Sequence, residues 1–185
     1  MKFIEYFGQK ALVIFAVTFI LTYLFLLIFK GKVKHDRKFL ISLFVAYLIT
    51  MSFIMFMPQK YLIEKGLSDK VGEVTFQSAA DRLRMEDLGI NLKPGHTIKS
   101  FWKHAPFINM FFNIFGNILI FVPVGFLLIK LIKDKKVIRT LLFIILISFT
   151  IEFVQFFIGR SVDIDDLILN VAGGIIGMGL GKLIK

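Results

Sequence analysis

Polar and ionisable residues recur at helical spacing inside the longest apolar segments of this chain. Glu152 and Gln155 lie in one such segment, three positions apart, so both side chains project from one face of a helix. A charged or amide side chain in the hydrocarbon of a bilayer is costly and usually faces a bundle interior or a water-filled cavity. A carboxylate held there can act as a general base or hold a hard cation. The pattern therefore predicts a polar site between helices.

Two further segments carry polar faces of the same kind. Asn113 and Asn117 are four positions apart in one, together with Asn109, and Asp166 and Asn170 have the same separation in the other. At 1.5 Å per residue, Asn113, Glu152 and Asn170 each lie about 9 Å inside the outer end of their helix. If these faces meet, they form one polar pocket in the outer half of the membrane. The residues predicted to bind a ligand there are Asn113, Asn117, Glu152, Gln155, Arg160, Asp163, Asp166 and Asn170.

Each of these residues also has a purely structural interpretation. Asparagines in membrane helices can hydrogen-bond neighbouring helices, at about 1 kcal/mol or less each. Asp163 can cap the helix that follows it, and Arg160 can pair with Asp163 as a surface clamp. A divalent cation held by Glu152, Asp163 and Asp166 is a further alternative. No metal site or cofactor is expected, because the chain has no Cys, no HExxH and no Gly-x-Ser-x-Gly.

Glycines continue the polar face of the last apolar segment. Gly173, Gly177 and Gly181 form two successive GxxxG steps, a spacing that lets helices approach closely in membranes. The pattern predicts helix packing, with a partner helix or a second copy of the chain among the possible neighbours.

Long runs almost free of charge decide the class of the protein. Of the 185 residues, 57% are hydrophobic, compared with about 45–50% in soluble domains. About 20 apolar residues suffice to cross a bilayer as a helix. We therefore predict an all-α, polytopic membrane bundle in a single domain, 1–185, with five transmembrane helices. The predicted helices are about 11–29, 39–57, 107–132, 137–158 and 164–184.

The distribution of Lys and Arg predicts the orientation. The net charge of +10 falls mainly in the loops after the first and third segments, whereas three Asp and one Arg follow the fourth. Basic loops stay in the cytoplasm, so we predict an external N-terminus, a cytoplasmic C-terminus and an extracytoplasmic loop over 58–106. In that loop, 78–88 is predicted as a short surface helix and Trp102 as an interfacial anchor. Since the charge has this topological explanation, no nucleic-acid partner is expected.

Two motifs resemble the VanZ-like family of membrane proteins. One is the Asn117-Ile-Leu-Ile-Phe-Val-Pro-Val-Gly125 segment. The other is Glu152-x-x-Gln155 followed by Arg160-x-x-Asp163-x-x-Asp166-x-x-x-Asn170-x-x-Gly173-x-x-x-Gly177. The resemblance places a VanZ-like core at about 107–181. It implies a multi-pass protein of the bacterial cell membrane and a role in lowering susceptibility to teicoplanin, a lipoglycopeptide antibiotic, with little effect on vancomycin.

The leading hypothesis is binding rather than catalysis. The pocket would open to the outer leaflet and bind a lipid-linked cell-wall precursor or a lipidated ligand, with Arg160 on an anionic head group. One alternative is an enzyme acting on a polyisoprenyl or phospholipid substrate, with Glu152 as general base. A second alternative is a structural partner of cell-envelope machinery. A third is a proton-coupled transporter, although the chain shows no inverted repeat of the kind that many transporters have.

Overall fold

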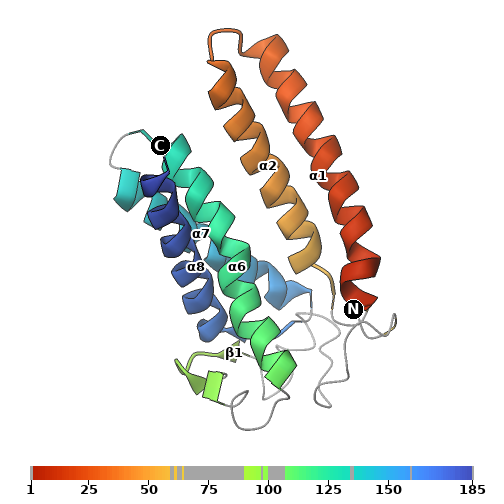
Figure 1. Ribbon diagram of the computed structural model, residues 1–185. Helices are drawn as coiled ribbons and strands as arrows, with labels where there is room; N and C mark the ends of the chain where they lie inside the picture. Colours follow the sequence, from red (N-terminus) through yellow and green to blue (C-terminus); the bar gives the residue numbers. More distant parts are fainter. Residues whose placement is uncertain are drawn as a thin grey trace.

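The structure is a computed structural model in which five long helices dominate (Figure 1). It describes residues 2–58, 61, 64, 90–96, 98–99, 107–133, 136–158 and 160–184, and for 2–6, 107–110, 112 and 113 it describes the backbone alone. The predicted surface helix 78–88 and the predicted anchor Trp102 lie outside these residues. The elements are α1 (Lys2–Phe29), α2 (His35–Met55), β1 (Ile90–Asn91), α6 (Phe107–Leu131), α7 (Lys136–Phe157), β2 (Val162–Asp163) and α8 (Ile164–Leu183).

The predicted all-α membrane bundle is confirmed. Within the described ranges, five helices are long and apolar enough to cross a membrane, and they correspond to the five predicted segments. The boundaries differ most at α1, which begins at Lys2 instead of residue 11, and at α2, which begins at His35 instead of residue 39. Backbone hydrogen bonding in a helix continues past the end of an apolar run, so hydropathy marks the span and not the whole helix.

Helices α1 and α2 form a hairpin that stands beside the other three helices (Figure 1). The rings of Phe19 and Phe39 pack edge to face across it, with centroids 5.3 Å apart. Much of α1 is nevertheless uncovered, including Leu12 and Ile28, which are 70% and 72% exposed. Apolar side chains on the outside of a membrane helix are solvated by lipid, so this surface fits a bilayer and not water.

The core lies where α2, α6 and α7 meet. Phe121 and Val124 of α6 and Ile144 of α7 are fully buried, and Met51 of α2 joins the same cluster. Pro123 lies inside α6, where tolerance of helix-breaking residues is characteristic of membrane helices.

Helices α6 and α8 pack backbone to backbone through glycines. A Cβ added at Gly177 would overlap the carbonyl oxygen of Val122, and one at Gly173 would overlap that of Ile118. A Cβ at Gly125 of α6 would overlap the carbonyl of Gly174, and one at Gly181 would meet the side chain of Ile129. The GxxxG face of α8 is therefore occupied by α6 of the same chain, and a partner helix is not needed to cover it.

The two ends of the bundle differ in character. At one end, the Arg37 guanidinium donates to the carbonyl of Leu131 at 3.1 Å, and the Lys130 ammonium donates to that of Ile184, so the basic segments gather there. At the other end, β1 pairs in parallel with β2, Ile90 opposite Val162 and Asn91 opposite Asp163. This grouping agrees with the predicted topology; which end faces the cytoplasm stays a prediction.

Candidate functional site

Glu152 lies near the end of α7 with its carboxylate turned toward the start of α8. Only 4% of the residue is exposed, and Oε2 accepts a hydrogen bond from the backbone N–H of Asp163 at 3.2 Å. The chain reverses direction between α7 and α8, which brings Arg160, Asp163 and Asp166 next to it. We call Glu152, Arg160, Asp163 and Asp166 the charged cluster.

Arg160 ties the charged cluster to α2. Its Nη1 donates to the carbonyl oxygen of Met55 at 3.1 Å, and Gln155 Nε2 approaches the same oxygen at a longer 3.5 Å. This carbonyl is at the C-terminus of α2, where the helix dipole favours a cation. Burial lowers the pKa of the Arg160 guanidinium, while the nearby Asp166 and Glu152 carboxylates raise it. Arg160 thus faces two carboxylates and one helix end.

Asp163 caps α8, as its structural interpretation predicted. Its side chain accepts from the backbone N–H of Asp165 at 2.9 Å, and its Oδ1 also accepts from Asn91 Nδ2 at 3.2 Å. One carboxylate therefore satisfies a free N–H at the start of α8 and holds the β1 segment in place.

Asp165 is a site residue that sequence reasoning missed. It is 1% exposed and accepts from the backbone N–H groups of Gly95 at 2.5 Å and Ile98 at 3.2 Å. We call residues 90–96 and 98–99 the strap, because these bonds and the β1–β2 pair fasten them across the start of α8. Asp165 lies between Asp163 and Asp166 of the motif, and that proximity is the signal that could have marked it.

Asp166 and Asn117 join α8 to α6 beside the cluster. Asn117 Nδ2 donates to Asp166 Oδ1 at 2.6 Å, and both residues are partly exposed. The structure thus brings together the predicted residues Asn117, Asp166 and Arg160 with Glu152. Asn113 lies in α6, one turn before Asn117, and its side chain lies outside the described residues.

Asn170 lies deeper than the charged cluster. Its amide nitrogen donates to Ser148 Oγ at 3.1 Å, and both residues are fully buried. Within the described part of the chain, Asn170 Oδ1 has no hydrogen-bond partner. Ser148 is one turn further along α7 from the cluster than Glu152, so Glu152 and Asn170 do not share the depth predicted for them. The prediction assumed that α7 ends level with the start of α8, whereas the backbone of Asp163 reaches back to Glu152.

Exposure divides the predicted ligand-binding residues into two groups. Asn117, Arg160 and Asp166 are partly exposed and can be reached from outside. The other four with described side chains are buried: Glu152, Gln155, Asp163 and Asn170. Among the described residues, no group of three or more His, Asp or Glu side chains is arranged to hold a metal ion.

An all-helical bundle with five membrane-spanning candidates and a buried charged cluster at one end defines a multi-pass membrane protein. The chain belongs to the VanZ/LLP1 family, whose model matches residues 44–185. It is also similar to Protein VanZ of Enterococcus faecium, at 35% identity over 71 residues. That alignment covers 38% of this chain and 44% of the relative, so the chain matches less than half the length of that protein. No solved structure matches the chain.

Proposed function

We propose that this protein lowers the susceptibility of a bacterium to teicoplanin-type lipoglycopeptides by binding a lipid-linked or lipidated ligand at the charged cluster. Membership of the VanZ/LLP1 family and the similarity to Protein VanZ support the resistance role. One observation supports the charged cluster as the binding site. Four ionisable side chains lie together where α7 is followed by α8, at one end of helices that suit a bilayer, where charge is costly and is usually retained for function.

The partly exposed residues are the proposed contacts. Arg160 offers a planar set of donors that suits a phosphate or carboxylate. Asp166 and Asn117 lie beside it and hydrogen-bond each other. These three residues would meet a ligand head group at the edge of the bundle.

The buried residues act from behind as positioning residues. Glu152 holds the backbone of Asp163, Asp163 caps α8, and Gln155 reaches the α2 end that also binds Arg160. Asp163 thereby fixes the start of α8, which carries Asp166, and Gln155 contacts the carbonyl that also holds Arg160. Asn170 is fully buried on Ser148 and belongs to this supporting group.

A lipid anchor on the ligand fits the setting. The helices around the cluster expose Phe115, Phe153 and Phe157 to the outside, so an acyl chain beside them would remain in an apolar environment. We propose that this end faces the outer leaflet, because the basic segments lie at the opposite end. A lipidated antibiotic and a lipid-linked precursor both reach the membrane from that side.

The test is the susceptibility of a host that expresses the wild type or matched variants at equal amounts in the membrane. We expect wild type to raise resistance to teicoplanin and not to vancomycin, and Glu152→Gln and Arg160→Ala to abolish the increase. Lys136→Ala removes an exposed charge from the opposite end and should retain it. Full protection by Glu152→Gln and Arg160→Ala would rule out the charged cluster as the working site.

A second candidate function is catalysis on a polyisoprenyl or phospholipid substrate. The observation that favours it is the burial of Glu152 beside a cation, an arrangement that suits an acid or base. Purified protein would be incubated with such lipids, with and without magnesium. Turnover that is lost in Glu152→Gln supports catalysis, and its absence across the lipids leaves binding as the function.

A further inference from the structure

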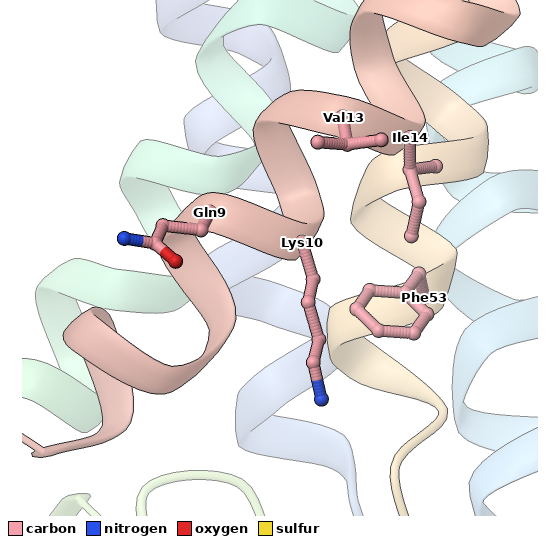
Figure 2. A pocket seen from close by; sticks show the side chains of 5 residues that line it. All are labelled: Gln9, Lys10, Val13, Ile14 and Phe53. Carbon is pink, nitrogen blue, oxygen red and sulfur yellow. The ribbon is translucent and has the colours of Figure 1, made fainter.

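A shallow groove of about 470 Å³ lies between α1 and α2, apart from the charged cluster. Figure 2 shows its lining, with Val13, Ile14 and Phe53 forming the apolar part. Gln9 and Lys10 extend from one turn of α1, and the Lys10 side chain runs alongside Phe53. We call this hollow the α1–α2 groove.

The α1–α2 groove opens to the surroundings of the bundle. Its lining comes from α1 and α2, and Val13 is 62% exposed. Both helices are membrane-span candidates, and the uncharged apolar run of α1 begins at Ala11. Lys10 directly precedes that run, so it lies at the edge of the predicted span. The groove therefore begins near one surface of the bilayer and continues into its hydrocarbon.

The position of Phe53 shows at which end of the bundle the groove lies. Phe53 is two residues before Met55, whose carbonyl accepts the bond from Arg160. The groove is thus at the same end as the charged cluster and opposite the end where Arg37 and Lys130 gather. A ligand in it would belong to the leaflet that the charged cluster faces.

The chemistry of the lining selects an amphiphile with a negative head. Lipid chains are the solvent at this depth, so one of them will lie over Val13, Ile14 and Phe53. Lys10 can bury its methylene stem along the apolar floor and place its ammonium at head-group level. A lipid phosphate whose own head group carries no positive charge complements that ammonium. We propose that the α1–α2 groove is a binding site for an anionic phospholipid, with its acyl chain on Phe53 and its phosphate at Lys10.

The site is independent of the proposed function, since it shares no lining residue with the charged cluster. Its test uses the full chain, delipidated in mild detergent and given equal amounts of phosphatidylglycerol and phosphatidylcholine. Native mass spectrometry then measures which lipid is retained. We expect wild type to retain phosphatidylglycerol preferentially and Lys10→Gln to reduce the preference about fivefold, from roughly 1 kcal/mol per basic residue near the surface. Lys10→Arg keeps a positive charge at the same position and should keep the preference.

A second variant tests the apolar part without touching the charge. Val13→Trp fills the groove and should reduce retention of both lipids, whereas Leu21→Trp, at an exposed position of α1 outside the lining, should not. Circular dichroism confirms that each variant keeps its helices. Equal retention of the two lipids by wild type, or wild-type retention in Lys10→Gln or Val13→Trp, overturns the proposal. A dimer that only Val13→Trp disrupts would also overturn it, because the occupant would then be a second copy.

Discussion

The three helices α6, α7 and α8 and the α1–α2 hairpin are all apolar enough to cross a membrane but differ in how they are packed. In α8, 44% of the most apolar 18-residue stretch is buried, compared with 6% of the corresponding stretch of α1. Helix α8 carries glycines and polar side chains at helical spacing, and α1 carries large apolar residues on every side. Hydropathy thus predicts that a segment enters the membrane, while small and polar residues predict which segments bind one another.

The largest expected contrast is between a buried and a lipid-facing residue of α6. Phe121 is fully buried and Leu119 is 62% exposed. Phe121→Ala should lower the free energy of unfolding by roughly 3–5 kcal/mol, because it leaves a cavity in the core. Leu119→Ala should have little effect. Thermal unfolding in detergent measures both, and equal losses would show that the two faces of α6 are not distinct.

The glycine interface gives the next largest effect. Gly177→Ala places a Cβ on the carbonyl of Val122, and overpacking of this kind costs about 1–3 kcal/mol or more. Gly179 has no atom near an added Cβ, so Gly179→Ala is the matched control and should be neutral or slightly stabilising. The melting temperatures of the two variants are compared with that of the wild type. An unchanged melting temperature in Gly177→Ala would mean that α6 and α8 are not in backbone contact.

The strap should respond locally to the loss of Asp165. Asp165→Ala removes the acceptor of two backbone N–H groups, and a bond to a charged group is worth about 1.5–3 kcal/mol. Hydrogen exchange at Gly95 and Ile98 should accelerate about tenfold or more, while the middle of α6 stays protected. Lys93→Ala, an exposed strap position, is the control. Unchanged exchange in Asp165→Ala would show that other contacts hold the strap.

The smallest effect is expected in α1. Leu12→Ala changes a residue that is 70% exposed and should alter the free energy of unfolding by less than about 0.5 kcal/mol. Met51→Ala on α2, at a 3% exposed position, should cost about 2–5 kcal/mol under the same conditions. A large loss in Leu12→Ala would indicate that this face of α1 packs against protein, for example in an oligomer.

The sequence predicts the five spans and the glycine contact because both depend on local spacing. A run of about 20 apolar residues is sufficient for a span, and Gly173, Gly177 and Gly181 lie on one face whatever they touch. It could not select the neighbour of that face. The choice of α6 becomes visible only when Val122 and Ile118 are found against the glycines.

The site was less predictable because its contacts join distant positions. Asp165 bonds to residues about 70 positions earlier in the chain, and two-residue strands such as β1 and β2 carry no periodic pattern. The level of Asn170 was missed for a related reason. Counting residues from the membrane surface assumes that neighbouring helices start together, and the reversal before α8 removes that alignment.

The contact between α6 and α8 also constrains the order in which the helices can pack as the chain is synthesised. Helix α7 lies between them in the chain, so the groove of α6 that receives the glycines stays empty while α7 is being inserted. The backbone of Val122 is already hydrogen-bonded within α6, so this waiting segment can remain in lipid without cost to its peptide groups. The contact between α6 and α8 can form only after α8 has left the ribosome, and until then this face of α6 is open to any other small-residue helix in the membrane.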